Sequence, residues 1–351
     1  RDYYASRGLG DVYKRQRQYN LGFELGLFNN RIRLEGDFYD SQSLDLLLNV
    51  PVPTITGYST QMQNIGKVQN RGMEFTLNTK NLTGEFSWSS NFNISFNKNK
   101  VLEVGVDGRP IYGSAANANN AFITKPGYPI ASFYGYKYIG VFQSEEELAK
   151  YPHLSGDKVG DGRYEDVNKD GVLDQNDKTI LGDNNPLFTA GFSNSFSYKN
   201  FTLDIQFTGS YGAEVFSFYK RMCGIYHGDR NGMIEQLGRW QSKDQPGDGI
   251  HFRPTRTPSG WQRDPSSAWV QDASYLRLRN LTLGYNFDQK VLDKMKMKGL
   301  RLYVTGQNLF TITNYVGYDP ETSSESGLAQ GGDYLGYPAA RSFIIGANIT
   351  F

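Results

Sequence analysis

The sequence of 351 residues has one cysteine, three histidines and almost no net charge, and each scarcity excludes a class of protein. A single cysteine, Cys223, cannot form an internal disulfide. The 37 Lys and Arg balance 36 Asp and Glu, and no basic stretch is present that could hold a nucleic acid. No CxxC, HExxH, GxGxxG or P-loop spacing occurs, and nothing places a base beside a nucleophile. We therefore expect a protein that is not an enzyme.

An initial methionine and a signal-peptide pattern are also lacking, and we interpret the chain as a fragment. Residues 1–16 show no sustained period of 2 or 3.6 and differ in pattern from the rest of the chain. We predict that residues 1–16 are a non-native or disordered start, unpaired with any sheet. Residues 17–351 are expected to form the folded part.

Alternation of apolar and polar residues is the dominant pattern from Tyr19 onward, in a chain with 39 Gly, 24 Tyr and 22 Phe. A period of two predicts β-strands that have one apolar face. Nine segments show it: 19–27, 32–39, 73–77, 86–96, 188–198, 201–207, 281–287, 300–304 and 343–351. The fold class is therefore predicted to be all-β and antiparallel.

Short and long connections alternate between these strands. The long connections are about 44–66, 99–186, 212–273 and 311–340. Short turns at one end and long extracellular loops at the other are typical of a transmembrane barrel in the outer membrane. Such a barrel has an even number of strands in a single bacterial chain, so about nine spanning strands predict only its C-terminal part. The aromatic segment 128–142 is assigned to the outer loops, because counting it as a span would place one flanking long segment in the periplasm.

A soluble antiparallel sandwich or a secreted adhesin would show the same alternation. Two features favour the barrel. Aromatic residues lie near the strand ends, as in interfacial girdles. The last strand also alternates without interruption to a terminal Phe351, where soluble domains more often end in a polar tail.

Residues 166–177, DVNKDGVLDQND, carry the pattern of a twelve-residue calcium loop. Oxygen ligands would come from the side chains of Asp166, Asn168, Asp170, Asp174 and Asp177 and from the carbonyl of Val172. Gly171 occupies the tight bend. The pattern departs from the usual loop at position 12, which is Asp177 and not Glu, and no clear helix pair flanks it. An acidic surface turn is the alternative to a structural Ca²⁺ site.

Tryptophans cluster in the long connection 212–273. Trp240, Trp261 and Trp269 could stack on sugar rings or pack the loops together. We keep these three as candidate substrate-binding residues beside the loop-packing alternative.

From about Tyr19 to Phe351 the chain resembles the C-terminal barrel of SusC/RagA-type TonB-dependent outer-membrane transporters of Bacteroidetes-like bacteria. The segments that carry the resemblance are VQNRGMEFTL at 68–77, GYPIASFYGYKYIGVFQ at 127–143, the calcium-like loop, FSYKNFTLDIQFTGSYG at 196–212, SYLRLRNLTLGYNF at 274–287, LRLYVTGQNLFTITNYVGYDPE at 300–321 and the final YPAARSFIIGANITF. Several independent blocks occur in the order of the family.

The resemblance implies a 22-stranded barrel with a plugged lumen, located in the cell outer membrane. It implies uptake of oligosaccharides or peptides, a SusD-like lipoprotein lid, and energy drawn from TonB through a segment upstream of this chain. It also implies that the barrel-assembly machinery reads the terminal strand, with Phe351 as the signal. A passive porin or surface adhesin barrel is the alternative of another class, and an outer-membrane enzyme is a more distant one.

Overall fold

The computed structural model describes residues 15–51, 60–105, 108–115, 118–224, 231–254, 264–321 and 327–351. Its main feature is one antiparallel sheet of nine long strands in the order β1-β2-β3-β4-β11-β12-β15-β16-β18. The strands are β1 Arg15–Leu27, β2 Ile32–Pro51, β3 Thr60–Leu82, β4 Phe86–Glu103, β11 Phe188–Tyr198, β12 Phe201–Tyr211, β15 Tyr275–Asn286, β16 Gly299–Thr313 and β18 Ser342–Thr350. All nine segments predicted from the period of two are confirmed as strands. The edge strands β1 and β18 are not paired with each other in the described part of the chain.

The N-terminal boundary predicted at residue 16 is wrong by two residues. Arg15 and Gln16 pair with Leu44 and Ser43 of β2, so they belong to the sheet. The sequence pattern missed these residues because the first residues of β1 are all polar. The alternation of apolar and polar residues begins only further along the strand. Residues 1–14 lie outside the described residues, and their predicted non-native origin stays a prediction.

The strand register separates the two faces of the sheet. Phe38 pairs with Met73, Met73 with Phe96, and the neighbouring pairs keep the same phase. Since alternate residues point to opposite faces, the apolar residues of β1 to β4 line one face and the polar residues line the other. Aromatic rings continue the apolar face onto β11, where Phe92 and Phe192 lie 6.4 Å apart, centroid to centroid. This face is the one that contacts lipid in a barrel wall.

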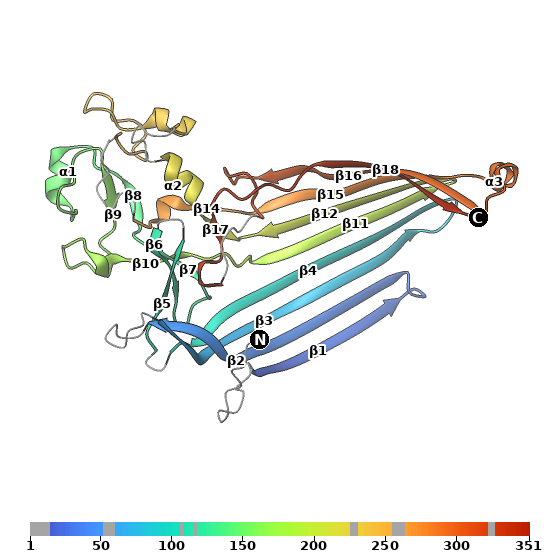
Figure 1. The fold of residues 1–351 in the computed structure, drawn as a ribbon, viewed down its shortest axis with the longest axis horizontal. Coiled ribbons are helices and arrows are strands. Elements are labelled where there is room, and N and C mark those ends of the chain that lie inside the picture. Colours follow the sequence, from blue (N-terminus) through green and yellow to red (C-terminus); the bar gives the residue numbers. More distant parts are fainter. Residues whose placement is uncertain are drawn as a thin grey trace, which may run out of the picture.

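The long connections fold into a loop domain at one end of the nine-stranded sheet, while short turns and α3 (Gln289–Met295) lie at the other end (Figure 1). It holds a sheet of β10 (Thr179–Gly182), β7 (Ser132–Gly135), β6 (Ala118–Thr124) and β5 (Ile111–Ala115), and a pair of β8 (Tyr138–Val141) with β9 (Gly162–Tyr164). A third sheet joins β14 (Val270–Asp272), β13 (Glu214–Ser217) and β17 (Gly332–Asp333). The helices here are α1 Glu145–Lys150 and α2 Phe218–Gly224, with single 3₁₀ turns η2 Gln175–Asp177, η3 Ile234–Gly238, η5 Ser267–Trp269 and η6 Gly327–Ala329.

The largest hydrophobic core cluster of the described residues lies in this loop domain. Phe122, Phe133, Phe216 and Phe218 are fully buried, and the rings of Phe122 and Phe133 pack edge to face at 5.7 Å. Burying one such ring contributes about 1.5–3 kcal/mol. The assignment of segment 128–142 to the loops is confirmed, because β7 and β8 belong to this packed unit. The loop domain is therefore a folded body and not a set of independent loops.

No helix in the described ranges is both long and apolar enough to cross a membrane.

Candidate functional site

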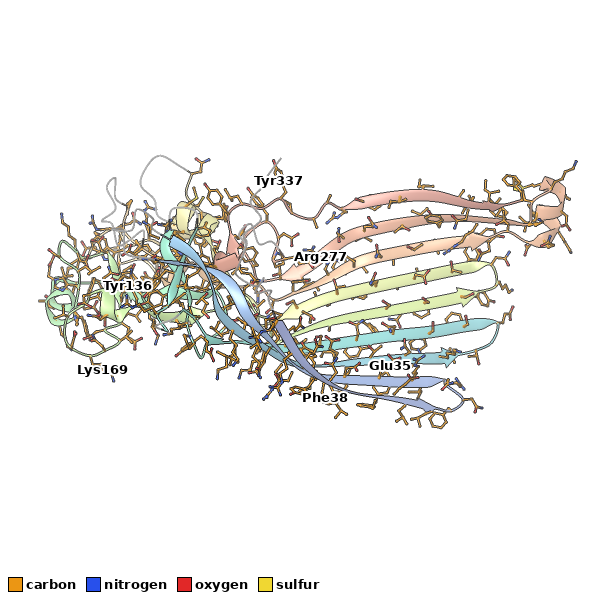
Figure 2. All side chains as sticks on the ribbon, turned by 60° about the horizontal axis from the view of Figure 1, so that its bottom comes forward. Glu35, Phe38, Tyr136, Lys169, Arg277 and Tyr337 are labelled. Atoms are coloured by element: carbon orange, nitrogen blue, oxygen red, sulfur yellow. The ribbon has the colours of Figure 1, made fainter. Side chains whose placement is uncertain are left out.

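The polar face of the sheet carries paired charges near the short turn between β1 and β2. Arg33 Nε on β2 lies 3.0 Å from Glu24 Oε1 across the β1–β2 pair and 2.8 Å from Glu35 Oε1 on its own strand. Figure 2 shows Glu35 on the long wall, well away from the loop domain. In the neighbouring strands the same face carries amides, and Asn91 Nδ2 donates to Asn78 Oδ1 at 2.7 Å. This polar, hydrogen-bonded face is suited to line a lumen that admits polar solutes.

A cavity of about 320 Å³ opens inside the loop domain, at the lower end of the range of ligand pockets. Its walls come from segments far apart in sequence, since Tyr138, Phe252 and Trp269 line it together with α2 and η3. The ring of Phe252 lies 5.2 Å from that of Tyr138 and 6.0 Å from that of Trp269. Three aromatic side chains therefore form one apolar wall.

Polar groups face the same cavity. Gln236 and Trp269 are 6% and 2% exposed, and Gln236 Oε1 and Trp269 Nε1 have no hydrogen-bond partner among the described residues. An unpaired buried polar atom costs about 1–3 kcal/mol, a penalty that a bound ligand can remove. Burial lowers the pKa of Lys220 below its ordinary value, and the nearby Glu235 carboxylate partly opposes this. His251 completes the lining, held by Asp248 with 2.6 Å between Nδ1 and Oδ2.

The three candidate tryptophans have different surroundings. Trp269 belongs to the core of the loop domain and also lines the cavity. Trp240 packs against the same core, and a Cβ at Gly160 would lie 2.5 Å from its ring. Trp261 lies outside the described residues. Trp240 and Trp269 thus pack the loops together, and the substrate-binding assignment stays a prediction.

The predicted calcium loop forms a compact turn at the end of the loop domain, where Figure 2 labels Lys169. Asp166 accepts the N–H of Lys169 at 2.7 Å and that of Gly171 at 2.9 Å, and Gly171 has φ 84° as the bend requires. Asp177 is fully buried and accepts the N–H groups of Val167 and Asp174 at 2.9 and 2.8 Å. The described residues contain no three His, Cys, Asp or Glu side chains close enough together to hold a metal. The carboxylates of Asp166 and Asp177 thus accept backbone N–H groups of the turn, and the Ca²⁺ assignment stays a prediction.

A buried ion cluster joins the wall to the loop domain and was not found from the sequence. Arg277 on β15 has a side chain that is 3% exposed, and its Nη2 lies 2.6 Å from Asp319 Oδ1. Its Nη1 pairs with Glu321, which also accepts from Arg279 and Tyr275. Figure 2 shows Arg277 where the long strands meet the loops. No local pattern in the sequence indicates this cluster, because the partners of Arg277 lie more than forty positions away.

Asp319 closes the cluster with backbone contacts. Its oxygens accept the N–H of Glu321 at 3.0 Å and of Ala339 at 2.9 Å. Burial alone would raise the pKa of Asp319, but the hydrogen bonds from Arg277 and these N–H groups hold it below its ordinary value. The segment after β16 is therefore fastened to the wall by a carboxylate whose charged form these contacts favour.

Comparison with known proteins connects this architecture to a family. A family model described as TonB dependent receptor-like, beta-barrel, matches residues 15–309. The chain is 36% identical to TonB-dependent receptor P3 of Formosa agariphila, over 97% of this chain and 34% of that protein. It is 29% identical to TonB-dependent receptor SusC of Bacteroides thetaiotaomicron, over 95% of this chain and 31% of SusC. A solved structure of the RagAB peptide transporter superimposes with a TM-score of 0.80 at 24% identity, covering 96% of this chain and 35% of that one.

The chain spans about a third of the length of these relatives. The resemblance inferred from the sequence blocks is confirmed, and the N-terminal limit of the matched region at residue 15 coincides with the start of β1. The chain therefore belongs to the TonB-dependent receptor β-barrel family, whose members lie in the outer membrane.

Proposed function

We propose that this chain is the C-terminal barrel wall and loop domain of an outer-membrane, TonB-dependent nutrient importer of SusC/RagA type. The observation that carries the proposal is the family match, which extends over most of the nine-stranded wall. The wall would form the conduit with its polar face, and the packed loop domain would contact the solute before it enters. In this proposal a SusD-like lipoprotein covers the loops, and TonB acts through a segment upstream of this chain.

The cargo is proposed to be an oligosaccharide or a peptide. The aromatic wall of the cavity together with Gln236 and Lys220 supports a ligand that has both apolar faces and polar edges. Both classes meet this description, and the structurally similar RagAB is a peptide transporter. A binding screen of the full-length protein against oligosaccharide and peptide libraries would assign the class.

Energised transport separates this proposal from a passive porin or an adhesin barrel. We expect that deletion of TonB abolishes uptake of the cargo in cells that express the full-length protein. Uptake of a radiolabelled cargo would be measured with intact TonB, without TonB, and without the importer. Uptake that persists without TonB would indicate a porin, and cell-surface attachment with no uptake in any strain would indicate an adhesin.

A structural Ca²⁺ in loop 166–177 is retained as a proposal. The support for the proposal is the spacing of the oxygen side chains in residues 166–177, and a carboxylate that accepts one or two N–H groups still has free lone pairs for a hard cation. Asp166→Ala combined with Asp170→Ala is expected to abolish Ca²⁺-dependent heat in calorimetric titrations of the full-length protein. Asp244→Ala, which removes an exposed carboxylate elsewhere, serves as the control. Identical titrations for the double variant and the parent would leave the acidic surface turn as the correct interpretation.

A further inference from the structure

Charged side chains cross the outer face of β1 to β4 directly beyond its last apolar row. The apolar row consists of Leu21, Phe38, Met73 and Phe96, which are neighbours in the strand register. The next two rows on the same face are Tyr19, Asp40, Arg71 and Lys98, followed by Arg17, Gln42, Gln69 and Lys100. Successive rows on one face lie about 6.6 Å apart along the strands. The surface thus changes from apolar to charged within a single row.

These rows contain four cations, Arg17, Arg71, Lys98 and Lys100, which we call the basic collar. Asp40 is their one carboxylate, and it lies 2.7 Å from Arg71 Nη2. Arg17 stacks on Tyr19 with 4.9 Å between its guanidinium carbon and the ring centroid. Lys98 and Lys100 have no acidic partner among the described residues. The collar therefore keeps an excess of positive charge.

The collar occurs only where the strands continue beyond the apolar band. β11 begins at Phe188 and β12 ends at Tyr211, and these two residues pair with each other. The ring of Phe188 contacts that of Phe96, so both strands stop at the last apolar row. The nine-stranded sheet does not extend to the level of the collar on β11 and β12. The positive charge is thus confined to one sector of the outer face.

The position of the collar relative to the membrane follows from the apolar band. Phe86 and Phe96 are the ends of the band on β4, about 33 Å apart along the strand, or about 25 Å across the membrane at a tilt near 40°. This is the height of the apolar band of an outer-membrane barrel. The short turns lie at the Phe86 end, so the collar lies at the extracellular boundary, where charged side chains on the lipid face cost little.

We propose that the basic collar binds the phosphate groups of anionic lipids in the outer leaflet. Arg71 and Arg17 present planar groups that match phosphate oxygens, and Lys98 and Lys100 add point charges that form no ion pair with a described carboxylate, although Asp183 lines the same hollow. Leu21, Phe38, Met73 and Phe96 lie one row deeper, where the acyl chains of the same lipid would pack. The charged rows therefore lie at the level of the lipid headgroup, and the apolar row lies at the level of the acyl tails.

Delipidated full-length protein in a non-ionic detergent would be titrated with diphosphoryl lipid A and the bound lipid counted by native mass spectrometry. Arg17→Gln, Arg71→Gln, Lys98→Gln and Lys100→Gln together are expected to weaken binding at least tenfold. The double variant Lys290→Gln with Lys294→Gln removes exposed cations from α3, at the opposite end of the wall, and should bind like the parent. Heat-modifiable migration on gels would confirm that each variant is a folded barrel.

The second ligand is lipid A without its phosphates. The parent protein is expected to bind it weakly, with the same affinity that the collar variant has for diphosphoryl lipid A. Equal binding of diphosphoryl lipid A to the parent and the collar variant would overturn the proposal. Equal binding of the two lipids to the parent would also overturn the proposal, because the lipid would then be bound through the apolar row alone. Displacement by inorganic phosphate at the lipid's own concentration would also overturn it, because the collar would then be a site for free anions.

Discussion

Replacing Arg277 by Met is expected to destabilise the attachment of the loop domain by about 3–5 kcal/mol, since Asp319 is left buried without its cation. The opening would be local, because the long strands keep their own backbone pairing. Hydrogen exchange of the full-length protein measures it directly. Backbone amides of residues 314–321 and 332–339 should exchange about two to four orders of magnitude faster than in the parent, by conversion of that free energy.

The matched controls separate the ion pair from general damage. Lys290→Met in α3 removes an exposed cation and should change exchange little. Arg277→Met combined with Asp319→Leu removes both charges, and it should be less destabilised than Arg277→Met alone. If the free-energy loss of the double variant equalled the sum of the losses of the two single variants, Arg277 and Asp319 would not be coupled. The ion cluster would then not be what holds the loop domain to the wall.

Acid is expected to release the same contact. The pKa of Asp319 is lower in the folded protein than in the unfolded chain. Its contribution is therefore complete above its unfolded pKa and is lost as the pH falls through the lower, folded value. Exchange at residues 314–321 of the parent should accelerate in that range relative to the Asp319→Leu variant. The same pH response in both proteins would assign the effect to another group.

Deletion of Phe351 is expected to deplete the protein from the outer membrane. The residue follows β18 directly and is 76% exposed, so it contributes little to packing of the chain itself. Its expected role is recognition by the barrel-assembly machinery, and abundance in outer-membrane fractions would be measured by quantitative immunoblotting. Phe343→Ala, which changes an exposed aromatic residue at the other end of β18, is the control that leaves Phe351 in place. Unchanged abundance after deletion would refute the assembly role.

The strands could be predicted from the sequence because a strand with one apolar and one polar environment alternates between apolar and polar residues. Phe192, Ile205 and Ile345 each mark an apolar face without reference to any other segment. The core of the loop domain could not be predicted from such a local pattern. Its core depends on contacts such as Phe122 with Phe216, whose rings lie 6.0 Å apart across almost a hundred residues of chain.

The functional candidates divide in the same way. The calcium-like loop is a local pattern and was visible, since all its oxygens lie within twelve positions. The cavity at Gln236 and the fastening at Arg277 were not, because each is assembled from distant segments and contains residue types that are ordinary in isolation. The aromatic residues near Trp269 signalled a packed cluster, but not the hollow beside it.

The length of β2 and β3 has a consequence for how the protein meets its surroundings. From Arg71 at the collar to its first residue, Thr60, β3 continues for about 36 Å along the strand. The wall therefore stands well clear of the lipid headgroups on this side. A large molecule in the medium can reach the upper part of β2 and β3 without entering the lipid.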